Sequence, residues 1–157
     1  PLQILSFYNG IANNGEMVKP TFLESTSKLG STNFYEFKKE IINPSICSKK
    51  TLSIVQKMLL DVIHHKNGTA KNIKSEHIKI AGKTGTAQIG YGTDEINYIS
   101  SFVGYFPADQ PKYSCIVVVN SPNKDIGYYG SDVAAPVFKR IAEKISSRFP
   151  ILSLIHI

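Results

Sequence analysis

A lysine, two threonines and a glycine follow one another in the segment Lys83-Thr84-Gly85-Thr86. An ammonium group and hydroxyls can hold a carboxylate, because charge-assisted hydrogen bonds are short and strong. The glycine lets a ligand lie against bare backbone. If the segment is a strand, Thr84 and Thr86 share one face and Lys83 lies on the other. We therefore expect these four residues to form a carboxylate-binding site at a strand edge, with Lys83 reaching it past the edge of the sheet.

Three strands are expected around this site. They cover residues His77–Ile89, Ile99–Phe106 and Tyr113–Asn120, and their short connections predict an antiparallel meander. Residues Cys115–Val119 form an unbroken apolar run, so we expect the third strand to be the most buried.

Helices are expected to cover this sheet. Apolar residues at helical spacing predict a helix over residues 2–12 that Gly15 ends, and a second helix between Ser48 and Gly68. A final helix is expected to start at Ser131 or Asp132. Its side chains facing the sheet are predicted to be Val133, Val137, Ile141 and Ile145. A meander covered by helices is an α+β fold rather than a doubly wound sheet.

The chain between the first two helices has little periodicity. Residues 16–22 read as a short extended segment, and residues 24–48 as a polar surface excursion with one hairpin near residues 34–42. The adjacent residues His64 and His65 are expected to be structural or solvated, because neighbouring positions on a helix cannot easily chelate one metal ion.

Composition narrows the classes of function. The net charge is +6, but the lysines are dispersed and no nucleic-acid motif accompanies them, so we expect a solvated basic surface and no nucleic-acid partner. Cys47 and Cys115 are expected to be unpaired thiols, with a disulfide as the alternative, and no metal or cofactor is expected. No apolar run reaches the ~20 residues of a membrane span. The chain starts at Pro1, and we expect it to be a piece of a longer protein.

The chain resembles the C-terminal part of the transpeptidase domain of class B penicillin-binding proteins, the cell-wall cross-linking enzymes of bacteria. Lys83-Thr84-Gly85 matches one of the three signatures of penicillin-recognising serine acyl transferases. The other matching segments, in the family's order, are Pro1-Leu2-Gln3 with residues 8–15, Val18-Lys19-Pro20, Gly68-Thr69-Ala70, residues 101–107, and Tyr128-Tyr129-Gly130 with residues 133–138. The resemblance covers residues 1–149 as part of one domain. Residues 150–157 form an apolar tail without an assigned role.

The resemblance implies acyl transfer through a serine ester. The family's nucleophile attacks a peptidoglycan stem peptide ending in D-Ala-D-Ala, and β-lactams imitate that donor. In this pattern Lys83 supplies positive potential, and the hydroxyls of Thr84 and Thr86 bind the donor carboxylate beside Gly85. The Thr86 backbone N–H would be one oxyanion donor. The resemblance further implies a parent protein anchored in the cell inner membrane, with its catalytic domain on the periplasmic side and with partners in cell-wall synthesis.

The family's nucleophile motif, Ser-x-x-Lys, and its Ser-x-Asn both precede the segment that matches Pro1-Leu2-Gln3. Apparent copies at residues 25–28, 31–33 and 121–124 are rejected, because they lie in the wrong order and not at expected helix starts. We therefore expect no nucleophile in this chain, and no transpeptidation or acylation by the chain alone. Alternatives within the same fold are a non-catalytic β-lactam sensor or binding module, a β-lactamase or a D,D-carboxypeptidase.

Overall fold

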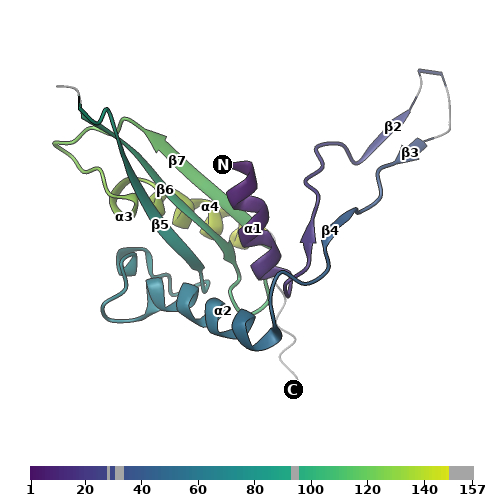
Figure 1. Ribbon diagram of the computed structural model, residues 1–157, viewed down its shortest axis with the longest axis horizontal. Coiled ribbons are helices and arrows are strands. Elements are labelled where there is room, and N and C mark those ends of the chain that lie inside the picture. The colour runs from purple at the N-terminus through teal and green to yellow at the C-terminus, as the bar shows by residue number, and fades with distance from the viewer. Residues whose placement is uncertain (28, 31–33, 93–95, 149–157) are drawn as a thin grey trace.

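A computed structural model describes residues 1–27, 29–30, 34–92 and 96–148 (Figure 1). The helices are α1 (Leu2–Ala12), α2 (Lys49–His64), α3 (Gly130–Val133) and α4 (Ala135–Arg148), with a 3-10 turn η1 (Lys71–Ile73). The strands are β1 (Met17–Val18), β2 (Ser25–Ser27), β3 (Phe34–Glu36), β4 (Ile41–Asn43), β5 (Ala81–Ile89), β6 (Asn97–Phe106) and β7 (Tyr113–Asn120).

The main sheet has the order β5-β6-β7, with both pairs antiparallel. This confirms the predicted meander and the α+β fold. The expectation that β7 is the most buried strand is wrong, because its residues are half-buried or exposed whereas most of the second half of β6 is buried. The reason is position. β6 is flanked by a strand on each side, and β7 lies at an edge, so its apolar run does not give it deeper burial.

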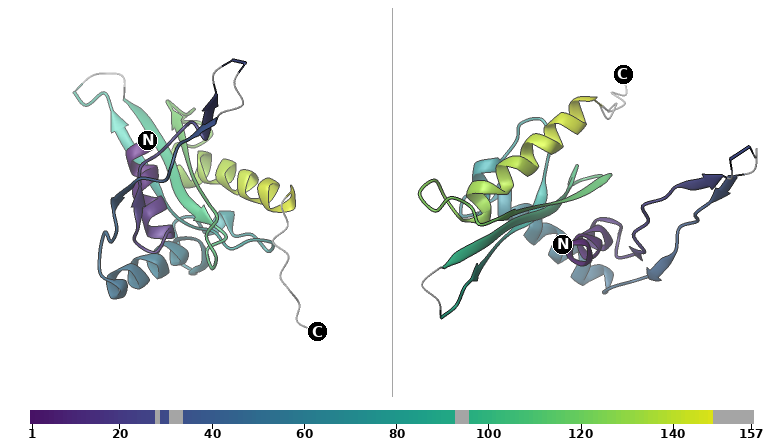
Figure 2. Two further views of the ribbon diagram at one scale, coloured as in Figure 1. Left: turned by 90° about the vertical axis from the view of Figure 1, so that its right-hand side faces the viewer. Right: turned by 90° about the horizontal axis from the view of Figure 1, so that it is seen from above.

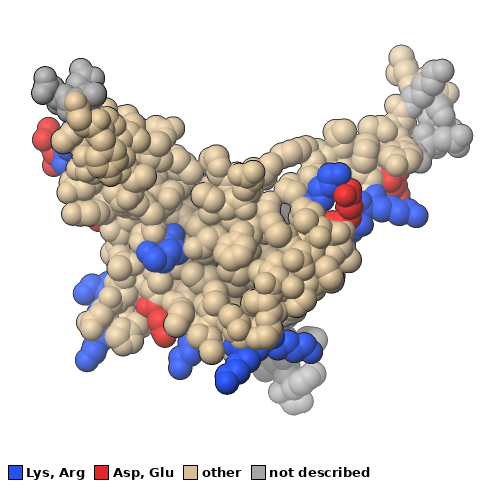
Figure 3. Space-filling model, viewed as in Figure 1, with Lys and Arg blue, Asp and Glu red and all other residues tan. Residues whose placement is uncertain are grey.

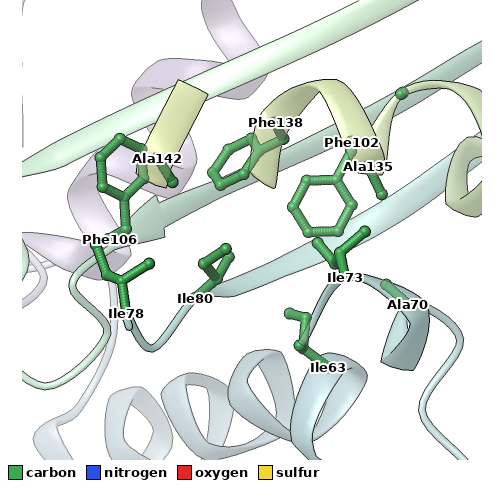
Figure 4. Close-up of a cluster of buried hydrophobic side chains, with 11 residues drawn as sticks. Ile63, Ala70, Ile73, Ile78, Ile80, Phe102, Phe106, Ala135, Phe138 and Ala142 are labelled. Carbon is green, nitrogen blue, oxygen red and sulfur yellow. The ribbon is translucent and has the colours of Figure 1, made fainter. Parts of the chain in front are cut away.

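The two faces of β6 carry two separate cores. Phe102 and Phe106 point into the larger core, beneath α4 (Figure 4). Tyr105 points to the opposite face, where it packs with Ile11 of α1 and Leu52 of α2, and burial raises the pKa of its phenol to about 12. Figure 2 shows α4 and α1 on opposite sides of the sheet. The alternation of side chains along β6 therefore decides which helix each residue meets.

The expected C-terminal helix is present but differs in two respects. Its start is divided into the short α3, preceded by Tyr129 and without a side-chain cap from Ser131 or Asp132, and the longer α4. The expected stripe is correct at Ile145, which packs against the larger core, and wrong at Val137. The fully buried residues of α4 are Ala135, Phe138 and Ala142, whereas Val137 is 41% exposed. A strict four-residue repeat drifts around a helix of 3.6 residues per turn, so the row from Val133 to Ile145 cannot stay on one face.

The second helix starts at its predicted cap but ends earlier than predicted. The Ser48 hydroxyl caps α2 by accepting a 3.1 Å hydrogen bond from the Thr51 backbone N–H. The helix ends at His64, four residues before the predicted stop at Gly68. Gly68 instead belongs to the tight turn that follows, where its N–H bonds to the His65 carbonyl at 2.9 Å.

The strands β1 to β4 form an arm that extends away from the sheet (Figure 1). β2 pairs with β3, and β1 pairs with β4, both antiparallel. The predicted surface excursion and its hairpin are therefore confirmed, although the hairpin begins earlier than expected. Both cysteines are free thiols, as expected. Among the described residues, none of the helices has the length and apolar character needed to cross a membrane. The expected tail at residues 150–157 lies outside the described residues.

Candidate functional site

The four predicted site residues lie on β5, an edge strand of the main sheet. Within the described part of the chain, only β6 pairs with β5. Lys83 is exposed and Thr84 is half-buried. The hydroxyls needed for a carboxylate are therefore not sealed inside a core.

The register of β5 against β6 confirms how the side chains alternate. Thr84 lies opposite Phe102, and residues directly opposite in an antiparallel pair share a face. Thr84 and Thr86 therefore lie on the face of the sheet that carries α3 and α4. Lys83 lies opposite Val103, on the face that carries α1.

Lys83 nevertheless reaches the threonine side of the strand. Its Nζ donates to the Thr84 carbonyl oxygen at 2.9 Å and to the Thr84 Oγ1 at 3.2 Å. An edge strand permits this path, because no neighbouring strand blocks the outer edge. The ammonium group and the first threonine hydroxyl are thus brought together, as the sequence predicts.

The Thr86 side chain is bonded by an element other than the turn that contacts Thr84. Its Oγ1 accepts a 3.0 Å hydrogen bond from the backbone N–H of Gly130, at the start of α3. A Cβ on Gly130 would lie 2.6 Å from the Gly85 carbonyl oxygen and 2.4 Å from that of Ser101. Only glycine fits this approach of α3 to the sheet, so Gly130 sets the place of the second hydroxyl.

Three tyrosines lie beside Gly130. Tyr98 stacks on Tyr128 with ring centroids 4.3 Å apart, and Tyr128 contacts Tyr129 at 4.4 Å. The hydrogen bond between the Tyr128 and Tyr129 hydroxyls raises the pKa of Tyr128. The Ser100 hydroxyl bonds to the Tyr128 carbonyl oxygen and ties the cluster to β6. The sequence contains the Tyr-Tyr-Gly segment, but only the fold brings Tyr98 to it.

The turn after α2 also contributes to the site. The Thr69 hydroxyl lies 3.3 Å from the Thr84 hydroxyl. Sequence reasoning gave Thr69 no role, because the contact joins residues 15 positions apart in different elements. The only signal was its place in the matching segment Gly68-Thr69-Ala70.

The apparent nucleophile motifs do not stand at helix starts. Ser25 and Ser27 lie in the exposed strand β2, and residues 28 and 31–33 are outside the described residues. Ser121 follows β7 with a positive φ of 48°, and its N–H bonds to the Tyr98 carbonyl. In the part of the chain that the structure describes, no three His, Cys, Asp or Glu residues are grouped so as to hold a metal ion.

Charge on the visible face is uneven. Figure 3 shows basic side chains gathered along the lower edge, and a mixed group of lysines and acidic residues on the arm. The arm's cations are partly neutralised by ion pairs, because Lys19 pairs with Glu40 at 2.8 Å and Lys39 pairs with Glu16.

Comparisons with known proteins find relatives along most of the chain. The peptidoglycan D,D-transpeptidase FtsI of Buchnera aphidicola subsp. Baizongia pistaciae is 33% identical over 147 residues, covering 92% of this chain and 24% of that protein. The penicillin-binding protein PbpB of Mycolicibacterium smegmatis is 31% identical over 157 residues, covering 94% of this chain and 24% of the relative. The chain thus spans about a quarter of the length of these curated relatives.

Solved structures show the same fold. The apo structure of penicillin-binding protein 3 of Mycobacterium tuberculosis superposes with a TM-score of 0.77 at 29% identity, covering 96% of this chain and 35% of that one. The apo transpeptidase domain of Burkholderia pseudomallei penicillin-binding protein 3 gives a TM-score of 0.73 at 28% identity, covering 95% of this chain and 42% of that one. The family model for the penicillin-binding protein transpeptidase domain matches residues 1–143, and the chain therefore belongs to that family.

Proposed function

We propose that this chain is the C-terminal part of a peptidoglycan D,D-transpeptidase domain, and that β5 binds the carboxylate of the peptide donor. The observation that carries the proposal is the row Lys83, Thr84 and Thr86 on one edge strand, with the Lys83 ammonium beside the Thr84 hydroxyl. The donor is a stem peptide ending in D-Ala-D-Ala, and a β-lactam occupies the same place. One solved neighbour, penicillin-binding protein 3 of Mycobacterium tuberculosis, is complexed with ampicillin.

Each residue has a distinct physical task in this proposal. Lys83 supplies positive potential, and the hydroxyls of Thr84 and Thr86 donate to the carboxylate, each such bond to a charged group contributing about 1.5–3 kcal/mol. Gly85 keeps the edge free of a side chain, so that a peptide can pair with β5 as an added strand.

The Thr86 backbone N–H serves as one oxyanion donor. The Thr84 carbonyl oxygen faces the open edge of β5, where Lys83 reaches it. In a regular strand, residues two apart direct their backbone groups to the same side, so Thr86 directs its N–H to that edge as well. Loss of one such donor typically lowers kcat by about 10²–10³-fold.

The nucleophile and the base lie outside residues 1–157 in this proposal. The chain alone then performs neither transpeptidation nor stable acylation, because a catalytic unit without its nucleophile loses the covalent route. The larger protein is membrane-anchored, with this domain on the periplasmic side and with other cell-wall synthesis proteins as partners. Fractionation of cells producing an epitope-tagged full-length protein tests that location.

The decisive experiment is covalent labelling. The full-length polypeptide, produced with the coding sequence upstream of Pro1, is incubated with a fluorescent penicillin, and the acylated peptide is identified by mass spectrometry. We expect labelling on a serine of a Ser-x-x-Lys motif before residue 1, and none of the isolated chain 1–157. Absence of labelling in the full-length protein, or an ester on Ser25, Ser27 or Ser121, would contradict the proposal.

The lifetime of the same ester separates the related activities. A stable ester together with cross-linking of a D-Ala-D-Ala peptide to an amine acceptor indicates a transpeptidase. Rapid hydrolysis of the β-lactam ester indicates a β-lactamase, release of D-Ala without cross-linking indicates a carboxypeptidase, and a stable ester without any turnover of peptide indicates a sensor.

A further inference from the structure

The carboxylate-binding row is the proposed set Lys83, Thr84 and Thr86 on β5. Thr69 lies outside β5 and places its hydroxyl beside this row. Its Oγ1 lies 3.3 Å from the Oγ1 of Thr84. Thr69 belongs to the turn between α2 and η1, and its side chain is exposed. The hydroxyl of Thr84 therefore has two polar neighbours, Thr69 on one element and Lys83 on its own strand.

The turn that carries Thr69 has a narrowly defined position. A Cβ on Gly68 would lie 2.4 Å from the Val62 carbonyl oxygen, so the backbone passes directly against the last turn of α2. The Ala70 N–H bonds to that same carbonyl at 2.9 Å, and the Ala70 side chain is fully buried in the larger core. With both neighbours fixed, Thr69 is held in place although it is exposed.

The chemistry of the three groups fixes the direction of the Lys83 hydrogen bond and leaves two directions for the bond between the threonines. Lys83 Nζ can only donate, whereas each threonine hydroxyl has one hydrogen and can accept as well. Thr84 Oγ1 accepts from Lys83, so its own hydrogen is free to point to Thr69. Between the two hydroxyls either oxygen can be the donor, so one arrangement of donors runs from Lys83 to Thr84 to Thr69, and in the other Thr69 donates to Thr84.

We propose that Thr69 is a positioning residue for the carboxylate-binding hydroxyl of Thr84. When a carboxylate arrives, the Thr84 hydrogen turns to the anion, and the Thr69 hydroxyl reverses to donate to Thr84 Oγ1. A group at position 69 that both accepts and donates keeps Thr84 satisfied in each state. It leaves the Thr84 hydrogen for the ligand, where a bond to a carboxylate is stronger than one to a neutral ester. This inference rests on the proposed function and adds a residue to it.

The test compares a ligand that has a free carboxylate with one that lacks it. The second-order rate constant of acylation is measured for the full-length protein with a penicillin and with its methyl ester. Thr69→Val removes the hydroxyl at nearly constant shape, and Thr69→Ser keeps it. Thr26→Val, on the exposed strand β2, is the control for loss of a threonine hydroxyl elsewhere.

We expect Thr69→Val to lower the ratio of the penicillin rate to the ester rate by about 3–10-fold, the range for loss of one hydrogen bond. Thr69→Ser and Thr26→Val are expected to retain the wild-type ratio. If Thr69 were merely structural, Thr69→Val would lower both rates by the same factor and leave their ratio unchanged. An unchanged ratio, with or without slower labelling, would overturn the inference while the proposed function stands. If the wild-type protein is labelled by neither compound, the proposed function fails and this inference fails with it. Should Thr69→Val not fold, Thr69→Ala gives the same comparison.

Discussion

The backbone N–H of Gly130 donates a 3.0 Å hydrogen bond to the hydroxyl of Thr86, joining residues 44 positions apart. The bond couples the start of α3 to the edge strand β5. The proposed carboxylate-binding row of Lys83, Thr84 and Thr86 is thus supported by several elements, because Thr84 is also contacted by Thr69 from the turn after α2. Perturbing any of these supports therefore changes the geometry of the row.

Gly130→Ala tests the close approach of α3 to the sheet. The added Cβ would meet backbone atoms of Ser101 and Gly85 at 2.4 and 2.6 Å, so α3 must move. We expect the free energy of unfolding to fall by about 1–3 kcal/mol, with weaker labelling by penicillin. The matched control is Gly10→Ala in α1, where the Cβ would meet Ile46 and Met17 at an ordinary 3.5 Å. That change is expected to stabilise the helix by about 0.5–1 kcal/mol. Equal urea midpoints for the two variants would contradict this reading.

Lys83→Met tests the role of the ammonium group. Loss of the positive charge beside the proposed carboxylate position is expected to lower the acylation rate constant of the full-length protein by about 10–100-fold, the range for an interaction with a charged group. Lys79→Met is the control, because Lys79 lies before β5 and its Nζ is 3.8 Å from Asp109. We expect that variant to be labelled at the wild-type rate. If the Lys83→Met protein is labelled as fast as the control, the proposed role of the Lys83 ammonium group in the site is wrong.

Phe138→Ala and Val137→Ala separate the two faces of α4. Phe138 is fully buried and contacts the rings of Phe102 and Phe106, with centroids 4.8 and 5.7 Å away. Its truncation is expected to cost about 3–5 kcal/mol of unfolding free energy. Val137 is 41% exposed, and its truncation is expected to change stability by less than about 0.5 kcal/mol. Chemical denaturation followed by circular dichroism measures both, and a larger loss for Val137→Ala would refute the assigned face.

His64 is expected to make folding sensitive to acid. Burial lowers the pKa of this imidazole, as do Lys74 and Lys79, while a backbone hydrogen bond with Ile80 and the charge of Asp61 act in the opposite direction. Its Nε2 is buried, and none of the described residues forms a hydrogen bond with it. The folded state therefore binds the proton more weakly than the unfolded chain, in which the pKa is 6.5. Stability is lost as the pH falls below about 6.5, and His64 contributes nothing to the pH dependence well above that value, where both states are neutral.

The measurement is the urea midpoint between pH 8 and pH 5 for wild type and His64→Gln. We expect the variant to show a smaller decrease toward pH 5. His65→Gln, at the adjacent exposed position, is the control and is expected to follow the wild type. A decrease that is the same in wild type and His64→Gln would assign the acid sensitivity to other groups.

Local signals in the chain were enough for most elements and for the placement of the proposed site residues on one strand. Apolar spacing and the Ser48 cap give α2, and short connections between apolar runs give the antiparallel meander, because these features depend on neighbours within a few residues. The alternation of Lys83, Thr84 and Thr86 across β5 also follows from strand geometry alone.

Burial and long-range contacts needed the folded chain. β7 carries an uninterrupted apolar run yet lies at an edge, and α4 offers two apolar rows of which the one with Phe138 meets the core. Both outcomes depend on which element packs next to which, and no local pattern contains that information. The same holds for the supports of the site. Thr69 and Gly130 reach Thr84 and Thr86 only because α2 and α3 pack against the sheet beside β5, and hydrogen bonds between distant segments form only when packing brings their donors and acceptors within about 3 Å.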